Sequence, residues 1–205
     1  FFPGIAGTYG IPMWTFYVNR GQAISCFGTK DKDHSYLEFW PANKAWQHTT
    51  TLGFRTFIKI KKSNTPLIYE PFSNGWTHAD FSITNKMSLT SYDLRLEETN
   101  ARLGLTTSVE YFTIPQDSYA ALVRKVTLRN TSRKPLSMEL LDGLPQVTPY
   151  GMNNFFLKEM SRTIEAWAVV ENTDRGVPYF KLAVDPGDRP EVVHISEGNF
   201  YLGFH

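Results

Sequence analysis

Cysteine is almost missing from this sequence, since Cys26 is the only one among 205 residues. A single cysteine excludes a framework of intrachain disulfides, so the fold must be held together by a hydrophobic core. The same shortage fits a reducing compartment, and we expect a cytoplasmic protein. The sequence also lacks any apolar run near the roughly 18 residues that a membrane-spanning helix requires, which predicts no membrane partner.

An excess of one charge is missing as well, because 21 lysines and arginines stand against 20 acidic residues. Nucleic-acid binding requires a dense cationic face, so we predict no nucleic-acid partner. The glycine-rich segment 4–10 lacks the spacing of a phosphate-binding loop, and no serine lies in a Gly-x-Ser-x-Gly elbow. The five histidines lack metal-ligand spacing. We therefore predict no metal site, no cofactor and no catalytic constellation in this chain.

Alternation of apolar and polar residues is the main pattern that the sequence does contain. In segment 91–97, apolar residues at positions 92, 94 and 96 alternate with charged residues at 93, 95 and 97. About a dozen segments of this kind occur, which is typical of antiparallel sheets with one buried face. Only residues 152–162 have a pattern compatible with a short helix. We predict an all-β fold, one large antiparallel β-sandwich domain over residues 1–205, with at most one short helix.

Aromatic residues are abundant, with 5 tryptophans, 10 tyrosines and 15 phenylalanines. Aromatic rings can stack on the apolar C–H faces of sugars while neighbouring polar side chains bind the hydroxyls, but the same rings also fill sandwich cores. Trp76, with Asn74 and His78 beside it, is the best candidate for an exposed carbohydrate-binding platform. Trp46 and Trp40 also lie in loop-like sequence with polar neighbours, and we include both as candidates.

Four segments have distinctive strand-and-turn patterns: 17–19 (YVN), 53–57 (GFRTF), 109–115 (VEYFTIP) and 121–132 (ALVRKVTLRNTS). Together they resemble the amino-terminal β-sandwich of the cellobiose-phosphorylase-like enzymes, which are inverting glycoside phosphorylases once classed as glycosyltransferase family 36. This resemblance implies a supersandwich of galactose-mutarotase-like form. In the family, the sandwich precedes a helical linker and an (α/α)6 barrel that carries the catalytic aspartate, and inorganic phosphate is the co-substrate.

The resemblance implies a role in carbohydrate metabolism without chemistry in this chain, because the chain is too short and too rich in strands to contain the barrel. No catalytic residue is therefore carried over. The apolar segments at both ends, 1–3 and 200–205, lead us to expect a fragment of a longer enzyme that phosphorolyses β-glucosides or β-glucans. Its implied partners are the helical-barrel catalytic domain of the same protein, a second copy in a homodimer, and an oligosaccharide.

The irregular stretch 144–160 is our candidate for a loop at the active-site entrance of the parent enzyme, with Tyr150, Asn153 and Asn154 as its candidate residues. An ordinary crossover between sheets would have the same sequence character. The scaffold hypothesis also predicts a large apolar face that is exposed when the barrel is absent.

Two other classes of function stay open. The first is a free-standing carbohydrate-binding module, in which Trp76 and Trp46 would be the platform residues. The second is a complete mutarotase-like sugar isomerase with a histidine acid and a carboxylate base, for which His78 or His194 would be the acid. That enzyme requires a histidine and a carboxylate to converge in one cleft.

Overall fold

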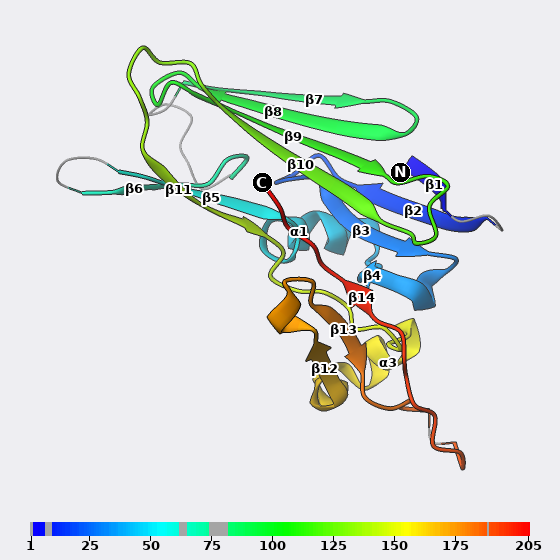
Figure 1. Ribbon diagram of the computed structural model, residues 1–205. Helices are drawn as coiled ribbons and strands as arrows, with labels where there is room; N and C mark the ends of the chain where they lie inside the picture. Colours follow the sequence, from blue (N-terminus) through cyan, green and yellow to red (C-terminus); the bar gives the residue numbers. More distant parts are fainter. Residues whose placement is uncertain (1, 7–9, 62–64, 74–81, 188) are drawn as a thin grey trace.

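The computed structural model describes the chain except for residues 1, 7–9, 62–64, 74–81 and 188. Within this part the predicted all-β fold is confirmed, since the strands form four antiparallel sheets (Figure 1). The first sheet contains β1 (Phe2–Ala6), β2 (Ile11–Tyr17), β3 (Ile24–Thr29) and β4 (Ser35–Leu37), in that order. The second sheet, in the order β10-β9-β8-β7, contains β7 (Ile83–Leu89), β8 (Asp93–Asn100), β9 (Leu105–Thr113) and β10 (Leu122–Asn130).

Two smaller sheets complete the described part of the fold. The third sheet, in the order β11-β5-β6, contains β5 (Arg55–Ile60), β6 (Leu67–Tyr69) and β11 (Met138–Gly143). The fourth sheet contains β12 (Ala168–Glu171), β13 (Tyr179–Leu182) and β14 (Asn199–Phe200). The second sheet lies across the first, and the fourth lies at the opposite end of the molecule from the second (Figure 1).

The period-two pattern of the sequence corresponds to burial on one face. In β8, Leu94, Leu96, Glu98 and Asn100 are buried, and the residues between them are more exposed. The main core lies between the first two sheets and joins residues of β2 and β3 to residues of β8 and β9. Separate clusters form under the third sheet, around Ile58, and beside the fourth sheet. This arrangement is that of a sandwich built on apolar packing.

The helical elements are short. Within the described residues they are α1 (Ala42–Leu52), α3 (Asn154–Glu159) and three 3-10 helices, η1 (Lys32–His34), η2 (Ser161–Trp167) and η3 (Thr173–Arg175). The helix α3 lies within the predicted segment 152–162, whereas the sequence pattern does not predict α1. The signal for α1 is weak because only Ala45 and Thr49 are buried along it and because Pro41 at its N-cap makes no side-chain cap. No helix in the described part of the chain has the length and apolar character needed to cross a membrane.

Candidate functional site

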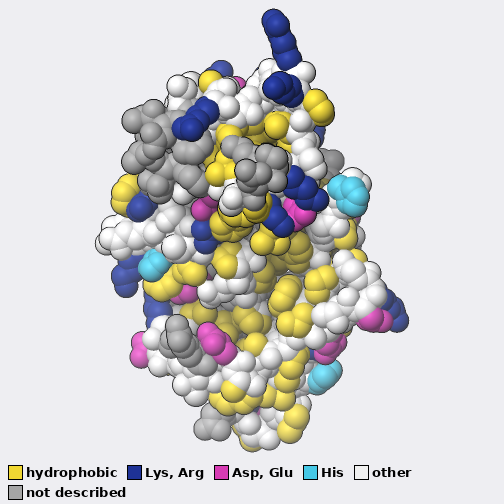
Figure 2. Space-filling model, turned by 90° about the vertical axis from the view of Figure 1, so that its left-hand side faces the viewer, with side chains coloured by type: hydrophobic (Ala, Val, Ile, Leu, Met, Phe, Trp, Pro, Cys, Tyr) yellow, Lys and Arg dark blue, Asp and Glu magenta, His cyan; other side chains and the backbone are white. Residues whose placement is uncertain are grey.

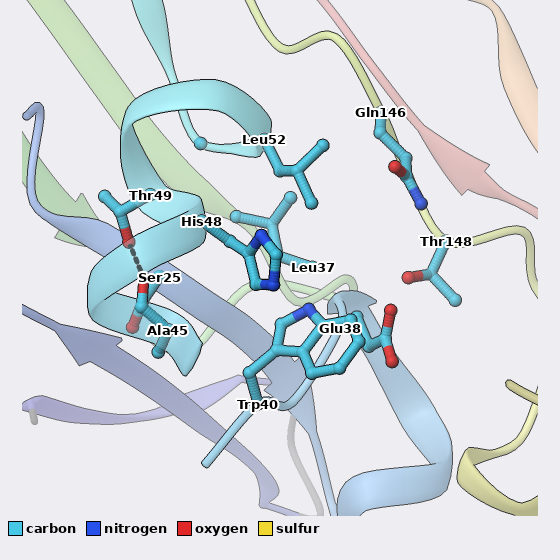
Figure 3. Close-up of a pocket in the computed structure, with 11 residues that line it drawn as sticks. Ser25, Leu37, Glu38, Trp40, Ala45, His48, Thr49, Leu52, Gln146 and Thr148 are labelled. Carbon is cyan, nitrogen blue, oxygen red and sulfur yellow. Dashed lines mark hydrogen bonds between the residues drawn. The ribbon is translucent and has the colours of Figure 1, made fainter. Parts of the chain in front are cut away.

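A pocket lies between α1 and the segment that follows β11, and we call it the Trp40 pocket (Figure 3). Positions 45, 48, 49 and 52 of α1 contribute one wall, since residues spaced by three and four share a helix face. The pocket has a cavity volume of about 30 Å³ behind a mouth that is open to solvent. Its lining residues are Ser25, Leu37, Glu38, Trp40, Ala45, His48, Thr49, Leu52, Gly53, Gln146 and Thr148.

The indole ring of Trp40 and the imidazole ring of His48 are the aromatic part of the pocket. Their centroids lie 5.2 Å apart with an interplanar angle of 42°. The ammonium group of Lys44 lies 5.5 Å from the centroid of the Trp40 ring. Trp40 is half-buried, so part of its ring stays accessible beside the polar lining. The Trp40 ring, a carbohydrate-binding candidate from the sequence, therefore has the partial exposure that stacking on a sugar requires.

The lining beside the Trp40 ring includes four polar side chains, those of Glu38, His48, Gln146 and Thr148. Figure 3 shows Gln146 and Thr148 on one side of the pocket, facing His48, with the Glu38 carboxylate beside the Trp40 ring. Within the described part of the chain, none of the four side chains makes a hydrogen bond. Their donors and acceptors are thus free for a polar ligand.

Burial raises the pKa of the Glu38 carboxyl, and the charges of Lys158 and Lys44 partly oppose this rise. Desolvation disfavours the charged carboxylate and favours the protonated carboxyl. A hydrogen-bond donor from a ligand would stabilise the charged form. Thr148 is fixed by its backbone, because its N–H donates to Tyr36 O at 2.9 Å and its carbonyl accepts from Asn199 Nδ2 at 2.7 Å. The wall that carries Thr148 is therefore tied to β4 and β14.

The other predicted carbohydrate-binding residues have different positions. Trp46 is 44% exposed, but the Arg20 guanidinium covers its ring, with Cζ 4.1 Å from the ring centroid. That ring face is not open to a sugar. Asn74, Trp76 and His78 lie outside the described residues. The structure describes two of the five candidates, Trp40 and Trp46, and of these two only Trp40 lines the pocket.

The three predicted entrance-loop residues make contacts that hold the chain in place. Tyr150 packs against the cluster beside the fourth sheet. Asn153 caps α3, since its Oδ1 accepts from Phe156 N at 2.8 Å. The backbone N–H of Asn154 donates to Asp33 Oδ1 at 2.8 Å. The part of stretch 144–160 that reaches the pocket is Gln146 and Thr148, which the sequence reasoning does not single out.

The isomerase hypothesis requires His78 or His194 to lie in one cleft with a carboxylate. His78 is not among the described residues, and His194 is exposed at an isolated bridge to Val184, away from the Trp40 pocket. His48 and Glu38 do line one pocket. Among the described residues, no group of three or more histidine, cysteine or acidic side chains is placed to hold a metal ion.

Comparison with known proteins gives no family for this chain. No protein-family model matches it, and no curated protein matches it significantly. The fold and the pocket therefore define only a class, an antiparallel β-sandwich with an aromatic and polar pocket beside its main helix.

Proposed function

We propose that this chain is a non-catalytic β-sandwich domain of a carbohydrate-active enzyme of cellobiose-phosphorylase-like type, and that its Trp40 pocket contacts a saccharide. The observation that carries the proposal is the combination of a partly exposed indole ring with four uncommitted polar side chains. An indole ring offers an apolar face for sugar C–H groups, and carboxylate, imidazole, amide and hydroxyl groups can bind sugar hydroxyls.

The position of the pocket also supports a role at a substrate entrance. Gln146 and Thr148 belong to the irregular stretch 144–160, so the long connection after β11 forms one wall of the pocket. Long connections of this kind often carry function when a rigid scaffold positions them. In the proposed parent enzyme, this wall would face a saccharide on its way to the barrel.

The size of the pocket limits how a saccharide can bind. A cavity of about 30 Å³ holds about one water molecule or one substituent of a sugar ring. The sugar would insert one edge and leave the rest over Trp40 at the open mouth. We therefore expect weak binding, with a Kd of about 1 mM, which corresponds to roughly −4 kcal/mol.

Exposed apolar side chains support the scaffold part of the proposal. Leu140 is 50% exposed and Leu141 is 70% exposed, and successive residues of a strand point to opposite faces. Both faces of β11, at the edge of the third sheet, thus carry an exposed leucine. Figure 2 shows hydrophobic side chains gathered in a hollow along the middle of one face of the molecule. Such a surface is what a barrel domain of the same protein would cover.

The test is a calorimetric titration of the chain with glucose, cellobiose and longer β-glucans. We expect millimolar binding of at least one saccharide, lost in Trp40→Ala and kept in the matched variant Trp46→Ala, because Arg20 already covers the Trp46 ring. No heat with any saccharide from a folded sample would refute the saccharide contact and leave the scaffold role alone. Equal loss in both variants would show that the Trp40 pocket is not the binding site.

A further inference from the structure

A second pocket lies beside another face of α1, and we call it the Arg20 pocket. Its volume is about 330 Å³, which is within the range of pockets that hold small molecules. Arg20 and its neighbours in the turn between β2 and β3 form one wall, and Thr50 of α1 lies against that turn. The lining also includes Phe54, Arg55 and Glu70. This pocket has room for a small molecule, unlike the Trp40 pocket.

The charges in the Arg20 pocket do not cancel. Arg55 is neutralised by Glu70 through two hydrogen bonds, from Nε at 2.7 Å and from Nη2 at 3.0 Å. Within the described part of the chain, no carboxylate lies within ion-pair distance of Arg20. The pocket therefore has one positive charge in excess, and that charge belongs to Arg20.

The guanidinium group of Arg20 is held in position but has unused donors. Its Cζ lies 4.1 Å from the centroid of the Trp46 ring, so a cation–π contact fixes its plane. Its Nη1 donates a long hydrogen bond of 3.4 Å to Trp46 O. Its Nε is buried and has no acceptor among the described residues. Its Nη2 is not among the buried atoms and donates no hydrogen bond within the described part of the chain, so an oxyanion in the pocket could accept from it.

The turn that carries Arg20 is rigid. Gly21 has φ +56° and Ala23 has φ +68°, and Ala23 N–H donates to Arg20 O at 3.1 Å. Two hydrogen bonds fix the side chain of Gln22: its Nε2 donates to Thr56 Oγ1 at 3.1 Å, and its Oε1 accepts from Arg124. A site that is fixed before binding loses little conformational freedom when a ligand arrives.

We propose that the Arg20 pocket binds the oxyanion of a small organic molecule, a carboxylate or a phosphate monoester. Arg20 supplies the charge and the donors, and the buried ring of Phe54 supplies an apolar wall for the rest of the molecule. The inference does not depend on the saccharide contact at Trp40, since no residue lines both pockets.

The test is a titration of the folded chain with glucuronate, glucose 6-phosphate and neutral glucose, at low and high salt. We expect at least one anion to bind, more weakly at high salt. The better anion identifies the carboxylate or the phosphate as the group recognised. Arg20→Met should weaken anion binding at least tenfold, and Arg20→Lys should weaken it less because lysine keeps the charge but not the planar fork. Arg175→Met, at an exposed arginine, is the matched control and should change nothing.

A second variant keeps the proposal testable if Arg20→Met does not fold. Trp46→Leu removes the ring under the guanidinium and should weaken anion binding by about two- to fivefold. The proposal is overturned if neither anion binds to the folded protein, or if folded Arg20→Met and Arg175→Met bind equally well. It is also overturned if neutral glucose binds as tightly as the anions and depends on Arg20. Failure of the saccharide proposal is distinct, because it is measured with neutral sugars and Trp40→Ala.

Discussion

The two pockets beside α1 differ in size and in the state of their polar groups. The Trp40 pocket has a volume of about 30 Å³ and is surrounded by several uncommitted side chains of different chemistry. The Arg20 pocket has a volume of about 330 Å³, and most of its charge is internally paired, with Arg20 as the exception. The first suits the edge of a neutral polar ligand, and the second suits a small anion. One helix thus separates two environments with different binding chemistry.

Helix α1 packs closely on β3, because Ala45 and Thr49 are small and Gly53 follows without a side chain. A Cβ at Gly53 would lie 2.5 Å from Thr49 O and 3.1 Å from Ile24 O. On the other face of the helix, the turn with Arg20 also lies close to α1, since a Cβ at Gly21 would lie 3.3 Å from Thr50 Cγ2. Hydrogen bonds from Gln22 to Thr56 and from Arg124 to Gln22 hold this turn in addition.

The largest effect is expected for the polar network behind the Arg20 pocket. Arg124 is 6% exposed and pairs with Asp142, which is 25% exposed. Its guanidinium also donates to Thr56 Oγ1 at 2.8 Å and to Gln22. Arg124→Met leaves Asp142 without its ion-pair partner and Gln22 without its charged donor, so we expect a loss of about 3–5 kcal/mol in the free energy of unfolding. Denaturation in urea measures this loss.

The control for Arg124→Met is Arg129→Met, at an exposed position of the same strand. It should change the stability by less than about 0.5 kcal/mol. If Arg124→Met folds, it should also weaken anion binding, because Gln22 loses its support, while the binding of neutral saccharides stays the same. Equal effects on both ligands would break the proposed division between the two pockets.

A medium effect is expected where α1 meets β3. Gly53→Ala introduces a Cβ against two backbone oxygens, which cannot move as a flexible side chain can. We expect a loss of about 1–3 kcal/mol and a shift of α1 that changes both pockets. Gly203→Ala is the matched control, because its added Cβ would have only an ordinary contact of 3.8 Å with Tyr201. A thermal unfolding midpoint equal to that of the control would show that α1 does not depend on this close approach.

The strands could be predicted from the sequence because each of the long central strands buries one face. In β8, and in β9 from Thr107 onward, every second residue is buried, so the pattern is visible without a structure. Helix α1 could not be predicted in this way. Its contact with β3 uses Ala45 and Thr49, and these two small residues produce almost no apolar signal.

The candidate site could be predicted only in part. Trp40 could be recognised as an aromatic residue in a polar segment, but Gln146 and Thr148 reach it through the tertiary fold from the far half of the chain. Trp46 is a case in which the sequence misleads, because its loop-like segment with polar neighbours predicts an exposed ring. Its ring is covered by Arg20, a residue from the turn between β2 and β3. Sequence patterns give the local setting of an aromatic ring but not what lies across it.

The smallest effect is expected at Glu38, and its size depends on pH. Burial raises the pKa of Glu38 above the ordinary value of 4.5, so the folded state binds more protons than the unfolded state just above that pH. Stability therefore falls as the pH rises through this interval. Glu38→Gln removes the penalty, and we expect it to raise the stability at neutral pH by less than about 1 kcal/mol, since solvent screens a half-buried charge.

Urea denaturation of wild type and Glu38→Gln at pH 4 and pH 7 measures the effect. The gain should be present at neutral pH and shrink toward zero in acid, where Glu38 is protonated in both states. Glu165→Gln, at an exposed position, controls for the change in net charge. A variant that is less stable than wild type at neutral pH would show that the Glu38 carboxylate makes a favourable interaction in the Trp40 pocket. Anion binding at Arg20 should not change, because Glu38 does not line that pocket.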